Sequence, residues 1–201
     1  MESANVKSVL LLSGGIDSTA LAFSEDPDAA LTIDYGQVCA EAEVQAAGEV
    51  CRELSIPHEV VHADCSDIGS GSMSKSEGQL EMSPTQEWWP FRNQLIITLG
   101  AMKAVRFDAS HLILGAVQDD TDHADGRVEF FESMDEVICQ QEGGLHVRTP
   151  GIHLTSIELV QQSEIPESIL AWAHSCHTSN YACGTCRGCR KYREVRDAAF
   201  S

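Results

Sequence analysis

Four cysteines crowd into a short C-terminal stretch with a spacing that suits a metal ion. They are Cys176, Cys183, Cys186 and Cys189, in the pattern C-x6-C-x2-C-x2-C. A C-x2-C turn lets two thiolates reach the same ion, and four thiolates leave a tetrahedral ion no open position. We therefore expect a structural zinc site, with an iron–sulfur cluster or redox chemistry as alternatives. His174 and His177 are reserve ligands.

A second segment, rich in glycine and serine, separates an apolar run from a helical pattern. Its sequence is Ser13-Gly14-Gly15-Ile16-Asp17-Ser18. Free N–H groups and the positive end of a helix dipole converge at such a turn, and glycines let a phosphate approach closely. Two hydroxyls add donors, and Asp17 suits a helix cap or a magnesium ion. Because the G-x4-G-K-[ST] and G-x-G-x-x-G patterns are both absent, the segment predicts another kind of phosphate loop, or else an ordinary turn.

Two further groups of polar residues suit anionic or hydrogen-bonding ligands. Arg92 and Asn93 open a helical stretch, and the planar fork of an arginine binds phosphate or carboxylate oxygens. Asp119, Asp120 and Asp122 follow an apolar run, where open α/β sheets bind their ligands. A surface arginine and a solvated acidic turn are the ordinary alternatives.

These candidate residues lie between short apolar runs that alternate with helical patterns. The runs predict strands at 7–12, 30–33, 58–61, 111–114 and 145–148. The helical patterns cover 17–23, 38–54, 91–106, 127–140, 155–162 and 166–173. The alternation predicts an α/β fold, an open parallel sheet of five strands with helices on both faces. We expect one α/β domain over 1–165, with a helical metal-binding segment over 166–201 packed on it.

One connection, residues 64–86, is rich in serine and glycine and poor in core residues. It is long for a compact domain, so we expect a mobile or partly disordered lid, or an idle surface insertion. Trp88 and Trp89 follow it, and their rings suit core packing or a stacked purine.

The overall charge limits the classes of partner. The 201 residues include 13 Lys and Arg against 31 Asp and Glu, a formal net charge of -18. Such a field repels nucleic acid and anionic membranes, although it permits a local pocket for a small anion. No apolar run reaches a membrane-spanning length, and no signal peptide is evident. We therefore expect a soluble cytoplasmic protein.

The glycine-serine loop and the cysteine pattern together resemble a known family. The loop is similar to the pyrophosphate-binding loop of the PP-loop ATPases, which cleave ATP between its α and β phosphates. The match is narrowed by Asp34-Tyr35-Gly36-Gln37, Arg92-Asn93, Asp119-Asp120 and the four-cysteine tail. In this order, over most of the chain, they resemble the 7-cyano-7-deazaguanine synthases of the queuosine-precursor pathway. The resemblance implies an adenine-nucleotide α-hydrolase-like fold.

The resemblance also implies an ATP-dependent carbon–nitrogen ligase that uses ATP, Mg²⁺ and Zn²⁺. Such enzymes adenylate the carboxylate of 7-carboxy-7-deazaguanine, let ammonia displace AMP to give an amide, and use a second ATP to form the nitrile. The implied nucleotide-binding residues are Leu12, Ser13, Gly14, Gly15, Asp17 and Ser18. The implied substrate-binding residues are Tyr35, Gln37, Arg92, Asn93, Asp119, Asp120, Asp125 and Arg127. The implied catalytic residues are Ser13, Asp17, Arg92 and Asp119.

The sequence departs from the family where a lysine is expected. Residues 149–156 read TPGIHLTS, so Ser156 stands in the lysine's place. Loss of a cation beside the triphosphate should weaken charge neutralisation, which puts one of the two ATP-dependent steps in doubt. Of the four lysines, we expect only Lys75 to be able to swing into the site. The loop 122–127 also lacks the family's usual tyrosine, proline and cysteine.

These departures leave the accepting amine open. One alternative is a diverged relative that conjugates the carboxylate to a protein amine and stops at an amide, as in antiviral defence. Another is a non-catalytic nucleotide-binding zinc protein. A third, a tRNA-thiolating PP-loop enzyme, conflicts with the net charge of -18. By analogy with the family we expect a homodimer, with no nucleic-acid or membrane partner.

Overall fold

The computed structural model describes residues 7–75, 78–120 and 122–200. Its strands are β1 (Ser8–Leu11), β2 (Ala29–Asp34), β3 (His58–His62), β4 (His111–Leu114) and β5 (His146–Arg148). Its helices are α1 (Ile16–Ser24), α2 (Ala40–Leu54), α3 (Arg92–Ala104), α4 (Val128–Cys139), α5 (Ser156–Ser163), α6 (Glu167–Leu170) and α7 (Arg187–Ala199). Within those ranges, every helix is too short or too polar to cross a bilayer.

The five strands form one parallel sheet in the order β3-β2-β1-β4-β5. Val9 of β1 is in register with Ala29 of β2 on one side and with Leu112 of β4 on the other. The chain leaves β1 toward β2 and returns later on the other side as β4, so a crevice opens between the loops that follow β1 and β4. One of those loops carries the glycine-serine segment and the other carries Asp119 and Asp120.

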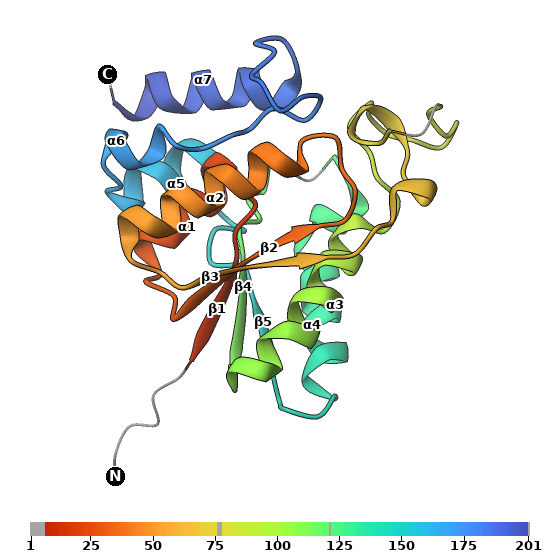
Figure 1. Ribbon diagram of the computed structural model, residues 1–201, viewed down its shortest axis with the longest axis vertical. Coiled ribbons are helices and arrows are strands. Elements are labelled where there is room, and N and C mark those ends of the chain that lie inside the picture. The colour runs from red at the N-terminus through yellow and green to blue at the C-terminus, as the bar shows by residue number, and fades with distance from the viewer. Residues whose placement is uncertain (1–6, 76–77, 121, 201) are drawn as a thin grey trace.

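Helices cover both faces of the sheet (Figure 1). The helices α1, α2 and α5 lie on one face, and α3 and α4 lie on the other. Alternation along β1 serves both layers, because Val9 and Leu11 pack toward α3 and α4, whereas Leu10 and Leu12 pack toward α1, α2 and α5. Strands buried on both faces need consecutive apolar residues. The predicted five-stranded α/β fold is therefore confirmed.

The last helix, α7, lies outside these layers, over the α1, α2 and α5 side (Figure 1). Val195 is 3% exposed and joins the apolar cluster that contains Leu159 and Val160 of α5. The sequence pattern did not predict α7 as a separate helix, and the helix expected over 166–173 shortens to α6. Much of the remaining surface of α7 is cationic, with Arg187, Arg190, Lys191, Arg193 and Arg196.

Part of the 64–86 segment packs against the body of the protein, whereas residues 78–82 are exposed. Two short 3-10 turns, Ser66–Ile68 and Gly71–Met73, interrupt it. The side chain of Met73 is 3% exposed and joins the core beside Trp89, which is 2% exposed. The carbonyl of Met73 accepts the N–H of Val38 at 2.9 Å. The stretch is poor in core residues, as expected, but Met73 is one of them, and the ring of Trp89 packs in the core.

Candidate active site

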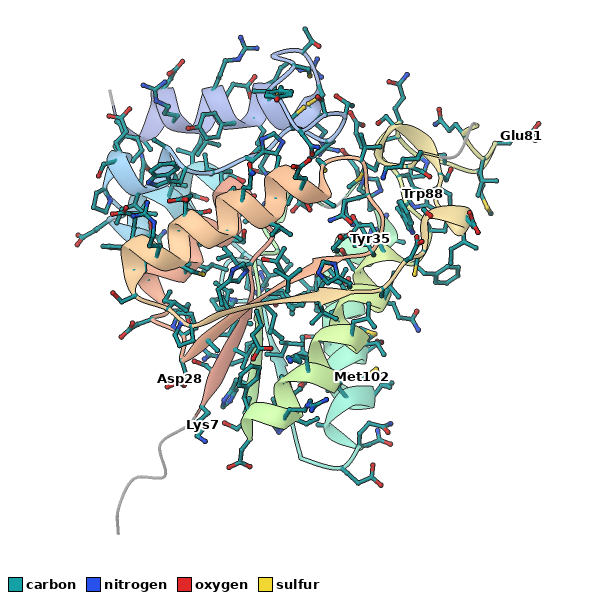
Figure 2. All side chains as sticks on the ribbon, viewed as in Figure 1. Lys7, Asp28, Tyr35, Glu81, Trp88 and Met102 are labelled. Atoms are coloured by element: carbon teal, nitrogen blue, oxygen red, sulfur yellow. The ribbon has the colours of Figure 1, made fainter. Side chains whose placement is uncertain are left out.

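A cavity of about 260 Å³ opens at the carboxyl edge of the sheet. The loops after β1 and β4, the start of α3 and the C-terminal segment line it. The predicted site residues that line it are Leu12, Ser13, Gly15, Asp17, Ser18, Tyr35, Arg92, Asn93 and Asp120. Figure 2 labels Tyr35 at this end of the sheet and Lys7 at the opposite end. The fold therefore brings together most of the residues that the sequence motifs single out.

The hydroxyls of the glycine-serine loop fix its shape. Ser13 Oγ lies 3.1 Å from Ser18 Oγ and accepts the N–H of Gly15 at 3.3 Å. The Ser18 hydroxyl donates to the carbonyl of Gly15 at 3.0 Å. Gly15 is the N-cap of α1 and offers no side-chain cap. The first-turn N–H groups of α1 and its dipole therefore suit an anion at the cavity wall.

Gly14 shapes this loop without lining the cavity. Its φ of +75° is left-handed, and a Cβ there would lie 2.7 Å from the carbonyl oxygen of Glu43 and 2.9 Å from the Cβ of Ala46. The helix α2 passes directly beside the loop, so only glycine satisfies both the backbone angle and the close approach.

Asp17 forms an ion pair with a lysine of the last helix. Lys191 Nζ lies 3.0 Å from Asp17 Oδ2 and 3.4 Å from Asp120 Oδ1. Burial raises the pKa of Asp17, and Lys191 opposes that rise. Burial disfavours the charged lysine, but Asp17 and Asp120 outweigh burial and raise the pKa of Lys191. The other oxygen of Asp17, Oδ1, has no partner within hydrogen-bonding distance among the described residues.

This ion pair corrects the expectation about Lys75. Lys75 lies at a separate hollow with Asp34 and His62, whereas Lys191 lines the cavity. The reason is that α7 crosses back over the loop after β1, which no local pattern in the sequence indicates. Ser156, where a lysine was expected, is buried in the first turn of α5.

A second cation of α7 holds the acidic loop after β4. Arg187 Nη1 pairs with Asp122 at 2.9 Å, and Nη2 donates to the carbonyl of Asp119 at 3.2 Å. The carboxylate of Asp119 accepts the N–H of Ser156 at 3.0 Å. Asp119 is thus bound to α5 and α7 and is not among the residues that line the cavity. Because Arg187 and Lys191 are four residues apart, they share one face of α7.

Arg92 lines the cavity at the start of α3. Its Nη1 lies 3.5 Å from Met73 Sδ, and within the described part of the chain no carboxylate forms an ion pair with its guanidinium. Burial disfavours its charge, but the charges of Tyr35 and Asp125, followed by Asp120 and Glu43, raise its pKa. Tyr35 is held edge-on against Trp89, with ring centroids 4.9 Å apart. A guanidinium in this position can take an anionic ligand.

Gln37 does not line the cavity, and its side chain forms hydrogen bonds within the protein instead. Its side chain is 1% exposed, and Oε1 accepts the N–H of Tyr35 at 2.9 Å. Its Nε2 donates to the carbonyl of Ile33 at 3.2 Å and to Glu43 Oε2 at 2.6 Å. These bonds fix the turn after β2 and the position of Tyr35, while the predicted contact of Gln37 with substrate stays a prediction.

Asp125 joins the loop after β4 to the start of α3. Its Oδ2 accepts the N–H of Asn93 at 3.2 Å, and its carbonyl accepts Asn93 Nδ2 at 2.6 Å. Arg127 is exposed at the N-cap of α4. Neither Asp125 nor Arg127 is among the residues that line the cavity.

Two residues of the cavity wall, Glu43 and His177, were not predicted to act there. Burial raises the pKa of Glu43, whose Oε1 lies 3.1 Å from Cys39 Sγ. Burial lowers the pKa of His177 to about 4, and its Nδ1 has no partner among the described residues. Glu43 was hidden among the acids of an amphipathic helix. His177 had one signal, its place next to Cys176, which suggested a reserve metal ligand.

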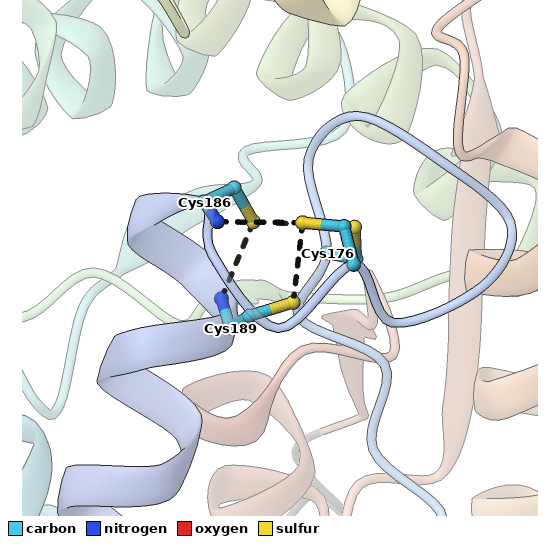
Figure 3. A group of neighbouring side chains, drawn as sticks. Cys176, Cys186 and Cys189 are labelled. Carbon is cyan, nitrogen blue, oxygen red and sulfur yellow. Dashed lines mark hydrogen bonds between the residues drawn. The ribbon is translucent and has the colours of Figure 1, made fainter.

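The four C-terminal cysteines converge on one point. This group of four free thiols, which contains no disulfide, is here called the cysteine knot. Figure 3 shows Cys176, Cys186 and Cys189 with their sulfur atoms turned toward one another. All four Sγ atoms lie within 4.8 Å of one another, and the pairs Cys183–Cys189 and Cys176–Cys186 are each 3.9 Å apart. Tetrahedral coordination with metal–sulfur bonds of ~2.3 Å places sulfurs about 3.8 Å apart. The predicted metal-binding group is thus confirmed as a cluster of the right size for one ion.

Hydrogen bonds from backbone N–H groups stabilise the deprotonated form of cysteines in this knot. The N–H groups of Thr185 and Cys186 lower the pKa of Cys183 to about 5. The N–H of Cys189 donates to Cys186 Sγ at 3.4 Å. His174 is bound elsewhere, with Nε2 3.0 Å from the carbonyl of Ser179. Among the described residues the metal-binding group comprises the four cysteines without a histidine.

The cysteine knot is joined to the glycine-serine loop. The N–H of His174 donates to the carbonyl of Gly14 at 2.8 Å, and Ser175 Oγ accepts the N–H of Ile16 at 3.4 Å. On its other side, Cys186 is the N-cap of α7. The knot therefore fixes the segment that crosses the loop and also the start of the helix that carries Arg187 and Lys191.

Comparison with known sequences gives a family match along the chain. A protein-family model described as queuosine biosynthesis protein QueC matches residues 7–201. The chain is 28% identical over 200 residues to a 7-cyano-7-deazaguanine synthase of Aliarcobacter butzleri (strain RM4018), which covers 92% of this chain and 88% of that protein. It is 28% identical over 218 residues to a 7-cyano-7-deazaguanine synthase of Desulforudis audaxviator (strain MP104C), and the match covers 96% of this chain and 98% of that protein.

Comparison with solved structures supports the fold alone. The U34-tRNA thiolase NcsA from Methanococcus maripaludis, solved with its [4Fe-4S] cluster, superposes with a TM-score of 0.51 at 17% identity. The match covers 96% of this chain, and the chain spans 64% of the thiolase's length.

Proposed function

Because the chain belongs to the family described as queuosine biosynthesis protein QueC, we propose that it is an ATP-dependent ligase acting on a deazaguanine carboxylate. It adenylates 7-carboxy-7-deazaguanine and joins the activated carbon to nitrogen, as the name of its 7-cyano-7-deazaguanine synthase relatives suggests. One observation carries the proposal: a phosphate-binding turn, Arg92 and Asp120 converge on one cavity in a chain that the family matches over residues 7–201.

The glycine-serine loop is the proposed site of the triphosphate. The first-turn N–H groups of α1 and the hydroxyls of Ser13 and Ser18 supply donors without adding charge. Leu12 lines the same cavity and gives the adenosine an apolar contact. Magnesium fits the carboxylates of Asp17 and Asp120, because it prefers oxygen ligands and Asp17 Oδ1 lacks a partner among the described residues. When bound, the ion would neutralise charge on the phosphates.

Arg92 is the proposed clamp for the substrate carboxylate. In the adenylation step, a carboxylate oxygen attacks the α-phosphorus, and the bond from that phosphorus to the bridging oxygen breaks. Pyrophosphate leaves with the electron pair, and an acyl adenylate forms. The protein lowers this barrier by alignment and by stabilising the departing charge. The absence of an ion pair at Arg92 among the described residues leaves its planar fork available for the carboxylate.

The second half of the proposed reaction needs an amine. Its nitrogen attacks the acyl carbon, AMP leaves with the carbon–oxygen electron pair, and the nitrogen loses a proton to give an amide. With ammonia as acceptor, a second ATP activates the amide oxygen, and loss of that oxygen gives the nitrile. Ser156 stands where a lysine was expected. Lys191, next to Asp17, supplies the cation for both ATP-dependent steps in its place.

Zinc is the proposed metal of the cysteine knot. The pairs of sulfurs 3.9 Å apart suit one tetrahedral ion, whereas a cluster of several irons would need its cysteines farther apart. The site has no open position, so its role is structural. Bound zinc would hold two parts of the chain in place: the segment 174–176, which contacts the glycine-serine loop, and the start of α7.

The test is a product analysis with purified protein, ATP, Mg²⁺ and 7-carboxy-7-deazaguanine, with and without ammonium. The proposal expects AMP and pyrophosphate, with two ATP consumed for each free nitrile formed when ammonium is present. Nucleotide binding without AMP release would favour a non-catalytic sensor. Release of ADP and inorganic phosphate would contradict adenylation.

One observation favours a protein amine as a second candidate acceptor. The segment 66–91, of which Met73 and Glu87 line the cavity, carries exposed apolar side chains, with Ile68 70%, Met82 77% and Phe91 76% exposed. Such a surface suits an extended peptide more than it suits ammonia. In the same assay, an amide as the final product, or a mass increase on a co-encoded protein, would support conjugation.

A further inference from the structure

We propose that Lys191 is the residue that binds the β- and γ-phosphates of ATP, and that Asp17 and Asp120 hold it in position until the nucleotide arrives. The inference rests on the proposed use of ATP and concerns a helix that the phosphate-loop motif does not include. It assigns to α7 a direct contact with substrate.

The position of Lys191 supports this assignment. Its Nζ lies 3.0 Å from the carboxylate of Asp17, a residue of the phosphate-binding turn itself. Its side chain is 23% exposed and lines the same cavity as Ser13, Gly15 and Ser18. An ammonium so close to the first turn of α1 can reach an anion at that helix end by rotation about its flexible stem.

The other three lysines are committed elsewhere. Lys7 lies at the amino end of β1, at the opposite end of the sheet (Figure 2). Lys103 pairs with Glu59 at 2.5 Å, and Lys75 lies at a separate hollow. None of these three lines the cavity.

The charge of the cavity favours such a cation beside the triphosphate. Asp17, Asp120 and Glu43 all line it, in a protein whose formal net charge is -18. A triphosphate brings further negative charge, which is costly beside carboxylates unless a cation compensates it. Of the cavity's other cations, Arg187 is already paired with Asp122 at 2.9 Å, and Arg92 is the proposed clamp for the substrate carboxylate. Lys191 is the cation paired with the phosphate-binding turn itself.

Nucleotide binding would therefore exchange one set of ionic contacts for another. In the described structure the ammonium of Lys191 bridges carboxylates from two loops, Asp17 after β1 and Asp120 after β4. If the ammonium turns to the phosphates, both carboxylates lose their counter-charge. They then become available to the divalent cation that accompanies ATP. Movement of Lys191 is thus linked to metal binding at the carboxylates.

The experiment measures ATP and AMP affinity by equilibrium dialysis for the wild-type protein and for Lys191→Met, Lys191→Arg and Lys7→Met. We expect Lys191→Met to weaken ATP binding roughly 10- to 100-fold, because it loses a charged contact. AMP binding should change less than about twofold, because AMP has no β- or γ-phosphate. Lys191→Arg should restore part of the loss, and Lys7→Met should behave as wild type.

A second measurement distinguishes a direct contact from a structural role. Without nucleotide, Mn²⁺ binding followed by electron paramagnetic resonance should be tighter in Lys191→Met, because the ammonium no longer competes for Asp17 and Asp120. A change that merely disturbed the fold would weaken ATP, AMP and Mn²⁺ alike. If Lys191→Met does not fold, Lys191→Gln serves the same comparison.

Equal losses of ATP and AMP affinity, or unchanged ATP affinity, would overturn the proposal. Its failure is separable from failure of the proposed function. If the wild-type protein binds ATP but releases no AMP with any carboxylate, adenylation fails, while the ATP-to-AMP comparison still decides the role of Lys191.

Discussion

Gly14 shows how one residue sets the shape of the proposed phosphate site. Its left-handed φ of +75° and its contact with α2 both exclude a side chain. Ser13 and Ser18 then close the turn with their hydroxyls, and Asp17 places a carboxylate beside it. The chemistry proposed for this turn therefore depends on a packing contact with a helix that carries none of the motif.

The comparison of Gly14→Ala with Gly144→Ala tests this packing contact. Gly144 has a similar left-handed φ of +60°, but a Cβ there meets no atom within 4 Å. Both variants should lose about 1–2 kcal/mol of unfolding free energy for backbone strain, and Gly14→Ala should lose about 2 kcal/mol more for the clash. Urea denaturation measures both values. Equal losses would show that α2 does not constrain the turn.

The role proposed for Arg92 gives a second prediction at this scale. Arg92→Lys keeps the charge but loses the planar fork, so the KM for 7-carboxy-7-deazaguanine should rise roughly 10- to 100-fold. The KM for ATP should stay within about twofold. Arg106→Lys is the matched control, because Arg106 is exposed beyond the end of α3. An unchanged carboxylate KM in Arg92→Lys would remove Arg92 from substrate binding.

At the level of elements, the cysteine knot connects the phosphate-binding turn to α7. Ser175 and His174 contact the turn directly before Cys176, and α7 begins directly after Cys186. Val195 anchors the far part of α7 in the core. The knot therefore positions Lys191 as well as stabilising a terminal segment.

Removal of the metal should loosen this segment and leave the sheet folded. After treatment with a chelator, amide exchange should accelerate over residues 174–192, while β1 and β4 stay protected. Cys183→Ser should reproduce the effect, and Cys139→Ser, outside the knot, should not. If exchange at 174–192 is unchanged after the metal is lost, the knot does not position α7.

The elements also show how far the sequence could predict the structure. The strand predicted at 111–114 coincides with β4, because a parallel strand buried on both faces is an unbroken apolar run. The glycine-serine turn and the cysteine spacing were also visible, because each is local. The path of α7 over the loop after β1 was not visible, because no local pattern indicates it. Lys191 was therefore missed, and Lys75 was named in its place. One signal was available, the spacing of Arg187 and Lys191 on a common helical face.

For the whole molecule, the formal net charge of -18 is the basis of a prediction about RNA. The thiolase that shares the fold is named for its action on tRNA, but the similarity at 17% identity concerns the fold alone. A net charge of -18 opposes a phosphate backbone over most approach directions. The cations of α7 that face the cavity, Arg187 and Lys191, are already paired with acids.

The corresponding prediction is that tRNA binds weakly. At physiological salt, we expect a dissociation constant weaker than roughly 100 μM by fluorescence anisotropy, because non-specific electrostatic attraction is missing. Arg190→Glu should leave that value unchanged, since the guanidinium of this exposed residue already donates to the carbonyl of Thr185 at 2.7 Å. Binding in the low micromolar range would show that the cations of α7 attract nucleic acid despite the net charge, and would contradict this prediction.

The central claim is that the cavity turns a carboxylate into an acyl adenylate. Its most direct test is the exchange of radiolabelled pyrophosphate into ATP, because only reversal of adenylation incorporates the label. We expect exchange that depends on 7-carboxy-7-deazaguanine, needs no amine, and falls by roughly two orders of magnitude or more in Asp17→Asn. Turnover that forms ADP with no label in ATP would contradict it.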